Sequence, residues 1–188
     1  VARPEGLPKD GDFELRSSTL AAPGEGQFLV AVRYVSIDPA MRVWMTEQKS
    51  YWPPVPLGDV MRASAIGEVV ASRHPRFAVG AWVSGMLGVQ DGLLSDGKGL
   101  RAFDPKQLPD PAWALSIFGG TGLTAYFGLG EIGKPKAGET LVVSAAAGAV
   151  GSTVVQIGKI LGCRVIGIAG GAAKCAFVRD ELGADGVI

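Results

Sequence analysis

The sequence has 188 residues, 47% of them hydrophobic, and its 18 basic side chains balance 18 acidic ones. This length and composition allow one large or two small domains with a sizeable core. The balanced charge argues against nucleic acid or an anionic membrane surface as a partner. No segment approaches the ~18 consecutive apolar residues that a membrane-spanning helix needs, so we expect no membrane span.

The first half of the chain is expected to be rich in short strands. β-branched or alternating segments occupy residues 27–35, 67–71 and 82–84, and turns containing glycine or proline separate them. Many short strands joined by such turns are typical of a small barrel or an open sandwich. Residues 85–110 are expected to form a loop with one short strand.

Helical patterns begin near Asp110. We predict helices over residues 112–118 and 123–132, with the glycine-rich residues 119–122 as the turn between them. A strand over 140–143 is expected next, followed by a turn and a helix with Val150, Val154, Ile157 and Leu161 on one face. After the helix we expect a strand over 164–168, a helix over 172–182 and a strand starting at Gly186.

The strand–turn–helix–strand unit has the pattern of a dinucleotide-binding site. Its turn, Ala146-Ala147-Gly148-Ala149-Val150-Gly151, differs from G-x-G-x-x-G only by the alanine at the first glycine position. Glycines in this turn let backbone N–H groups and a helix N-terminus approach a pyrophosphate. Ala146 can make the turn at some steric cost. The alternative is an ordinary βαβ unit whose small residues serve only close packing of the helix on the strand.

The end of the second strand indicates which dinucleotide is bound. NAD sites usually place Asp or Glu about 20 residues after the glycines, where it holds the ribose 2′-hydroxyl. No acidic residue occurs between Ser152 and Arg179, and Lys174 follows a glycine-opened turn. A lysine attracts the 2′-phosphate that a carboxylate repels, so the sequence favours NADP(H) over NAD(H). The alternative for Lys174 is a solvated lysine at the start of a helix.

Metal chemistry has little support in the sequence. It contains two cysteines, Cys163 and Cys175, and one histidine, His74. Their spacing matches no zinc-ligand set, and the proline-flanked, polar surroundings of His74 predict an exposed turn. We therefore expect neither a metal site nor a Ser-His-Asp triad. The cysteines fall in a strand and a helix pattern, which favours free thiols and a reducing, cytoplasmic setting.

Three segments together resemble the zinc-independent medium-chain dehydrogenase/reductases. They are Ser36-Ile37-Asp38-Pro39-Ala40-Met41-Arg42, Gly122-Leu123-Thr124-Ala125-Tyr126-Phe127-Gly128 and Ala145-Ala146-Ala147-Gly148-Ala149-Val150-Gly151. Within the family, the chain is most similar to the leukotriene B4 dehydrogenase / prostaglandin reductase group, and there to the bacterial NADPH-dependent curcumin reductases. Residues 51–61, 133–141 and 165–171 carry that closer likeness.

The resemblance covers essentially the whole chain and implies an α/β protein of two domains. A GroES-like β-barrel domain would occupy residues 1–115, and the first part of a Rossmann domain would occupy residues 116–188. A complete Rossmann sheet has about six parallel strands and this sequence supplies about three, so we expect a fragment of a longer protein. We expect the 188-residue chain alone to be catalytically weak or inactive.

The family reduces the carbon–carbon double bond of α,β-unsaturated ketones and aldehydes with NADPH, and the resemblance implies the same activity and a homodimer at full length. It places Gly148, Ala149, Val150 and Gly151 along the pyrophosphate, Gly170 and Lys174 at the 2′-phosphate, and Thr124 near the nicotinamide carboxamide. Two departures stand out. Residues 119–122 replace the family's Gly-Met-Pro-Gly, and residues 86–92 lack aromatic side chains, which argues against curcumin itself as the substrate.

Reduction of an enone also needs a proton for the α-carbon, and Tyr51 is the candidate donor. It stands beside Trp52-Pro53-Pro54 in a loop that the sequence places at a cleft. The alternative for Tyr51 is a packing aromatic in a proline-rich loop. Two other functions stay open, an NADPH quinone reductase and a non-catalytic NADP(H)-binding sensor, because a fold does not fix a function.

Overall fold

The computed structural model describes residues 2–188 of the protein. The chain divides into two compact units, the first ending at Leu115 and the second beginning at Ser116. The first unit has two clusters of buried apolar side chains and the second has one. Because no cluster is shared, each unit can be described by itself.

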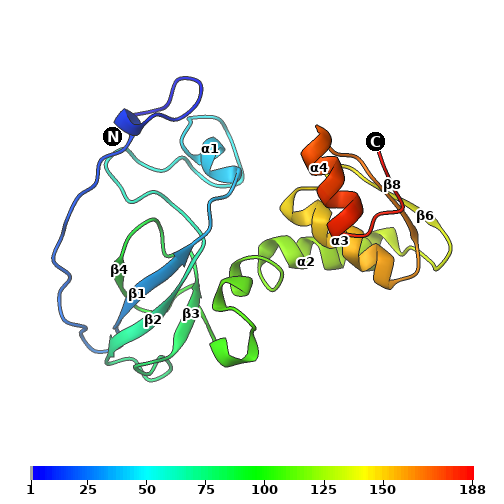
Figure 1. The fold of residues 1–188 in the computed structure, drawn as a ribbon. Helices are drawn as coiled ribbons and strands as arrows, with labels where there is room; N and C mark the ends of the chain where they lie inside the picture. The colour runs from blue at the N-terminus through cyan, green and yellow to red at the C-terminus, as the bar shows by residue number, and fades with distance from the viewer. Residues whose placement is uncertain (1) are drawn as a thin grey trace. The chain divides into compact units, whose positions relative to one another are not determined.

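The first unit is built on a five-stranded antiparallel sheet (Figure 1). Its strands are β1 (Phe28–Val35), β2 (Ala65–Ser72), β3 (Trp82–Gly85), β4 (Gly92–Ser95) and β5 (Arg101–Phe103), in the order β4-β1-β2-β3-β5. Two register shifts interrupt the pairing of β1 with β2. Such bulges bend a sheet, as the curved sheets of small barrels require. The side chains of Phe28, Val30, Val69 and Val83 are buried in its core.

The sequence located the longer strands of this sheet and missed a short one. Residues 85–110 hold two strands, β4 and β5, where one was expected. β5 has only three residues, which is too few for an alternating pattern to stand out. The unit also contains four short helices, which are η1 (Asp10–Asp12), α1 (Ala40–Trp44), η2 (Pro105–Gln107) and η3 (Pro111–Leu115).

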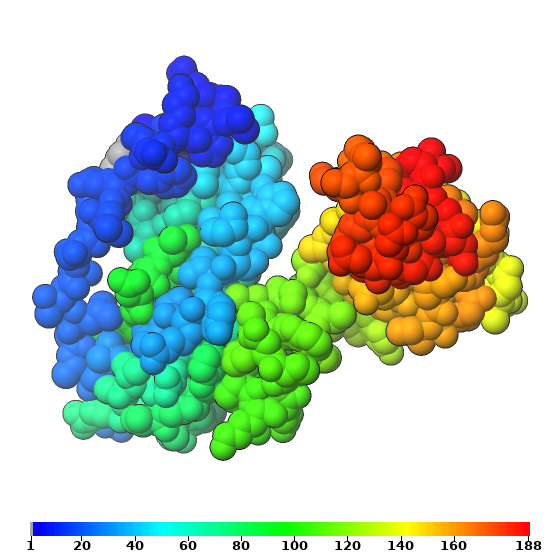
Figure 2. All heavy atoms as spheres, viewed as in Figure 1, coloured from blue at the N-terminus to red at the C-terminus, as the bar shows by residue number. Residues whose placement is uncertain are grey.

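Residues 2–13, which we call the N-terminal segment, lie near α1 and the loop that follows it, as the blue and cyan atoms of Figure 2 show. Two arginines attach it there. Arg3 donates from Nη1 to the carbonyl oxygen of Val55 at 2.8 Å, and Arg42 donates from Nη2 to that of Gly6 at 2.7 Å. The segment is therefore held by side-chain to backbone hydrogen bonds rather than by a strand pairing.

The second unit is a parallel α/β structure. Strands β6 (Thr140–Val143), β7 (Arg164–Gly167) and β8 (Gly186–Val187) form a sheet in the order β6-β7-β8. Helix α3 (Ala149–Ile160) connects β6 to β7, while α4 (Ala172–Ala176) and the wider helical turn η5 (Phe177–Glu181) connect β7 to β8. This is the strand order of half a doubly wound sheet, as the sequence predicted.

Helix α2 (Gly120–Phe127) begins inside the glycine-rich stretch rather than after it. A Cβ atom on Gly122 would stand 1.8 Å from the carbonyl oxygen of Ile117, so only glycine lets the first turn of the helix approach the preceding chain this closely. The turn expected over residues 119–122 is therefore wrong. The helix continues into a wider turn, η4 (Gly128–Gly133), and the helix expected over 112–118 is the short 3-10 helix η3.

Among residues 2–188, no helix has both the length and the apolar character that crossing a bilayer requires.

Candidate cofactor-binding turn and tyrosine loop

The turn between β6 and α3 presents backbone N–H groups at the start of a twelve-residue helix. Gly148 is the N-cap, with φ −81° and ψ 169°, and its carbonyl oxygen accepts the first helical hydrogen bond from Ser152 at 2.8 Å. Ala149, Val150 and Gly151 follow, and the first amides of a helix have no acceptor within the helix. These amides and the helix dipole make the turn suited to a phosphate.

Gly151 allows the helix to sit directly on the turn. A Cβ atom there would stand 2.2 Å from the carbonyl oxygen of Ala145 and 2.9 Å from the Cα atom of Ala146. At Gly148 the same atom would meet only the Ala145 oxygen, at 3.2 Å, with open space otherwise. The two glycines therefore differ in role. Gly151 lets the helix pack closely on the turn, and Gly148 leaves the outer side of the turn free of side-chain atoms.

The conformational strain of the turn lies at Ala145 rather than at Ala146. Ala145 has φ +48°, in the left-handed region that a residue with a Cβ rarely adopts. Ala146 is fully buried and belongs to the core of the second unit. The sequence pattern placed the steric cost at Ala146, one residue too late, because the pattern aligns glycines and does not reveal backbone dihedrals.

The turn after β7 carries Gly170, Gly171 and Lys174. Gly171 has φ +83°, which favours glycine, and a Cβ on Gly170 would meet nothing within 4 Å. The Lys174 side chain is exposed and forms no ion pair or hydrogen bond with any residue from 2 to 188. A positive charge without a protein partner, beside a turn with open space, fits a phosphate group.

Thr124 lies in α2, where its hydroxyl donates to the carbonyl oxygen of Gly120 at 2.7 Å. The oxygen of the hydroxyl keeps its capacity to accept a hydrogen bond, as from a carboxamide. Thr124 is in the same unit as Gly148–Gly151 and Lys174, so the predicted cofactor residues share one unit.

Tyr51 lies in the other unit, in the loop between α1 and β2. Its side chain is 76% exposed and forms no hydrogen bond with residues 2–188. The phenol is therefore free to reach a ligand. The packing alternative does not describe Tyr51 but does describe its neighbour Trp52, which stacks on Trp44 with ring centroids 5.9 Å apart.

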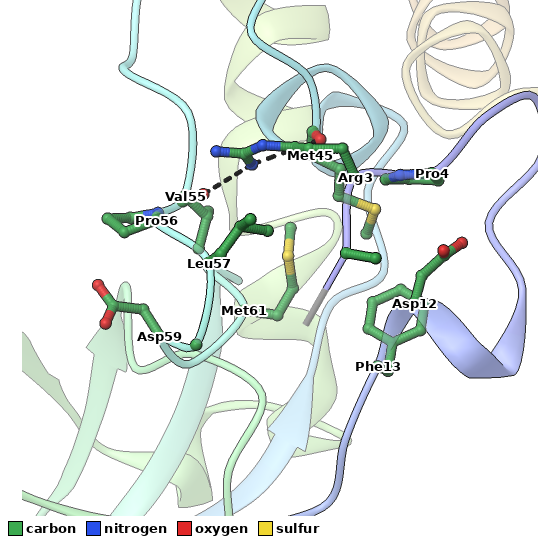
Figure 3. A pocket seen from close by; sticks show the side chains of 12 residues that line it. Arg3, Pro4, Asp12, Phe13, Met45, Val55, Pro56, Leu57, Asp59 and Met61 are labelled. Carbon is green, nitrogen blue, oxygen red and sulfur yellow. Dashed lines mark hydrogen bonds between the residues drawn. The ribbon is translucent and has the colours of Figure 1, made fainter.

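A small hollow of about 60 Å³ in the first unit lies between the N-terminal residues and residues 55–61 of this loop (Figure 3). Its walls include Arg3, Phe13, Met45 and Met61, and the Arg3 guanidinium bonds to Val55 along its edge. None of the predicted site residues lines it. The hollow therefore belongs to the packing of the N-terminal segment and not to the predicted site.

The His74 ring is half-buried against two aromatic side chains. Its ring lies 5.5 Å from that of Phe28 and 4.9 Å from that of Phe77, and its Nδ1 accepts from the Arg76 N–H at 3.0 Å. The expected turn is present at Pro75 and Arg76, which are exposed, but the His74 ring is half-buried because it folds back on the core. Within residues 2–188, no group of three or more His, Cys, Asp or Glu side chains could hold a metal ion.

Sequence reasoning missed Arg62. Its guanidinium carbon lies 4.8 Å from the ring centroid of Trp52 and 5.4 Å from that of Trp44, and Nη1 donates to the carbonyl oxygen of Pro53 at 2.9 Å. An arginine ten residues after a tryptophan has no recognised spacing signal. Only the folded loop brings these groups together.

Known proteins share both units of this chain. A family model described as the N-terminal domain of oxidoreductase matches residues 1–103. The NADPH-dependent curcumin reductase of Escherichia coli (strain K12) is 49% identical over 186 residues, covering 98% of this chain and 53% of the relative. Prostaglandin reductase 1 of Rattus norvegicus is 42% identical over 184 residues, covering 96% and 53%.

A crystal structure of CurA from Vibrio vulnificus in complex with NADPH is 48% identical, has a TM-score of 0.92, and covers 100% of this chain and 55% of that one. The chain thus spans about half the length of the relatives it matches. The matches include the segments on which the sequence resemblance rested. The chain belongs to the zinc-independent medium-chain dehydrogenase/reductases, in the branch of the curcumin and prostaglandin reductases.

Proposed function

We propose that this chain forms the NADP(H)-binding and proton-donating part of a reductase that saturates the carbon–carbon double bond of α,β-unsaturated ketones and aldehydes. The observation that carries the proposal is the pair of openings in the second unit. One is the turn at Gly148, where an added Cβ would meet only one atom, and the other is the turn at Gly170 with the unpaired Lys174. The names of the relatives, curcumin reductase and prostaglandin reductase, support the substrate class.

The chain's residues have distinct roles in this proposal. The amides of Ala149, Val150 and Gly151 bind the pyrophosphate at the start of α3, and Gly148 leaves room for it. Lys174, next to Gly170, binds the 2′-phosphate. The Thr124 hydroxyl accepts a hydrogen bond from the carboxamide and so orients the ring.

NADPH, when bound, supplies the hydride for the β-carbon of the enone. The Tyr51 phenol supplies the proton for the α-carbon, so the double bond gains one hydride and one proton. A homodimer and a cytoplasmic location stay predictions.

The experiment follows NADPH oxidation at its absorbance band with a panel of 2-alkenals, enones and quinones. It uses a protein of the relatives' length that carries this chain, with NADH in parallel. Turnover of enones with NADPH preferred is the expected result. Lys174→Ala should lower the preference for NADPH over NADH about tenfold, since one charge-assisted contact is worth roughly 1.4 kcal/mol or more.

Lys136→Ala is the matched control, because Lys136 is an exposed lysine of the same unit and lies outside both turns. Equal use of NADH and NADPH by the unaltered protein would contradict the proposal that Lys174 binds the 2′-phosphate. NADPH binding without turnover of any enone would favour a sensor, and turnover of quinones alone would favour a quinone reductase.

A further inference from the structure

The loop that carries Tyr51 has no helix or strand to hold it. We call residues 48–62, between α1 and β2, the tyrosine loop. Its middle is attached at Val55, whose N–H donates to the Trp44 carbonyl oxygen at 2.9 Å and whose own carbonyl oxygen accepts from Arg3 at 2.8 Å. These bonds fix a residue four positions from Tyr51, so the position of Tyr51 needs a contact closer to it in the chain.

Arg62 holds the residues next to Tyr51 in two ways. Its guanidinium lies 4.8 Å from the ring centroid of Trp52, within reach of a cation–π attraction. The same group donates from Nη1 to the carbonyl oxygen of Pro53 at 2.9 Å. One planar group thus contacts the side chain of one residue and the backbone of the next, which a lysine ammonium cannot do with the same geometry.

Trp44 makes this arrangement rigid. It ends α1, is only 6% exposed, and its ring stacks on that of Trp52 with an interplanar angle of 26°. Arg62 also lies 5.4 Å from the centroid of the Trp44 ring. Arg62 has no acidic partner among residues 2–188, so the aromatic rings and the Pro53 carbonyl are the groups that fix its charge.

We infer that Arg62 is the positioning residue for Tyr51, acting through Trp52 and Pro53. The Tyr51 side chain has no bond of its own to set its place, and the peptide bond ties it to Trp52. Fixing Trp52 and Pro53 narrows the space in which the phenol can lie. This inference rests on the proposed function, in which Tyr51 gives the proton to the substrate.

The kinetic test compares Arg62→Met, Tyr51→Phe and the double variant in enone reduction. Arg62→Met should lower kcat about tenfold with little change in KM, because a misplaced catalytic group loses rate rather than ground-state binding. In the Tyr51→Phe background the same change should have almost no further effect. Arg62→Lys, which keeps the charge but not the planar group, should give an intermediate loss.

Arg33→Met is the matched control. Arg33 is an exposed arginine of the same unit that pairs with Glu68 on the sheet. It should leave kcat unchanged. Losses that simply multiply in the double variant would overturn the inference, since Arg62 would then act independently of Tyr51. If Arg62→Met fails to fold, Arg62→Lys alone and with Tyr51→Phe gives the same comparison.

A second measurement needs no activity. An endoproteinase specific for lysine cuts after Lys49, inside the tyrosine loop, and leaves position 62 uncut in the proteins compared, so the rate of that cut reports how often the loop opens. Arg62→Met should speed cleavage at Lys49 several-fold, and Arg33→Met should not. An unchanged rate would overturn the inference. If the unaltered protein reduces no enone, the proposed function fails, while the cleavage rates still decide whether Arg62 orders the loop.

Discussion

Gly148 and Gly151 lie three residues apart in one turn but face different surroundings. An added Cβ at Gly151 would meet backbone atoms at 2.2 and 2.9 Å, whereas one at Gly148 would meet a single oxygen at 3.2 Å. Backbone atoms cannot move aside as a flexible side chain can. The same substitution should therefore affect the fold at one position and the ligand at the other.

Gly151→Ala is expected to lower the free energy of unfolding by about 1–3 kcal/mol, the usual effect of overpacking a filled site. Gly148→Ala should cost less than about 1 kcal/mol, as for an alanine at an N-cap, but should weaken NADPH binding about tenfold or more. Denaturant unfolding and a fluorescence titration with NADPH measure the two effects. Equal loss of stability in both variants would contradict the assignment.

Asp185 shows how a single carboxylate joins α3, β7 and the chain before β8. Both its oxygens accept from Lys159 Nζ at 2.7 Å, and Oδ2 also accepts from the Val165 N–H at 2.7 Å. The Lys159 hydrogen bond first, and then the Val165 N–H, hold the pKa of Asp185 below its ordinary value. The folded state therefore favours the charged carboxylate.

A pKa lower in the folded than in the unfolded state gives stability that is present above the unfolded value. That stability is lost as the pH falls through the folded value. Asp185→Asn should thus destabilise the protein at neutral pH, and the difference should shrink below about pH 4. Unfolding midpoints measured from pH 7 to pH 3 test this, with Asp91→Asn as an exposed control. A difference that is independent of pH would refute the electrostatic role.

At the scale of elements, the end of the α2–η4 helix carries an uncommon backbone. Lys134 has φ +45° and ψ +48°, the left-handed conformation that usually selects glycine after a helix, and its N–H donates to the Leu129 carbonyl oxygen at 2.7 Å. The side chain is exposed and makes no hydrogen bond or ion pair within residues 2–188. The lysine side chain therefore makes no contact here that would compensate for the strained backbone.

Lys134→Gly is expected to raise the free energy of unfolding by about 0.5–1 kcal/mol, because the relief of the left-handed strain outweighs the added freedom of the unfolded chain. The same change at Lys136, whose φ is ordinary, should lower stability by a similar amount. Thermal unfolding of the two variants side by side gives the comparison. Destabilisation by Lys134→Gly would show that the free energy of the left-handed strain is smaller than the entropic cost of ordering a glycine.

Helices and strands with a regular spacing of apolar residues were predictable from the sequence. Elements whose position depends on close approach of two backbone segments were not. Strand β6 and helix α3 lie where they were expected. The buried residues of α3 are, however, Gly151, Thr153, Val155 and Gly158 and not the predicted apolar set. The start of α2 was misplaced because glycine is read as a turn signal, while Gly122 serves the approach to Ile117. Helices of five residues, such as α1, give too short a pattern to detect.

The candidate site divides in the same way. Gly148, Gly151 and Lys174 follow local rules of turn chemistry and charge, so the sequence could name them. The contacts of Arg62 with Trp44 and Trp52 join residues far apart along the chain, and no local pattern reports such a cluster. The position of the strain at Ala145 likewise depends on dihedral angles.

At the scale of the whole molecule, the parallel sheet of the second unit is covered unevenly. Val143 and Val165 pack in the core with Val155 of α3 and Val178 of η5. Side chains alternate across a sheet, so Val142 points to the opposite face, where it is 58% exposed. Ile168 follows β7 and Ile188 follows β8, each two residues after a residue that pairs on that face, and they are 41% and 75% exposed.

Parallel sheets are normally buried on both faces, so in the 188-residue chain by itself this apolar face should bind apolar probes. Val142→Thr keeps a β-branched side chain on β6 and makes the face more polar. We expect it to reduce the fluorescence of a bound apolar dye while changing the free energy of unfolding by less than about 0.5 kcal/mol, the range of exposed substitutions.

Val70→Thr in β2 is the control, because Val70 is 48% exposed on the antiparallel sheet of the other unit, where one solvated face is ordinary. It should leave dye binding nearly unchanged. Equal reductions by the two substitutions would show that the dye detects exposed valines in general. A reduction confined to Val142→Thr would locate the apolar surface on the face of β6 and β7 that α3 does not cover.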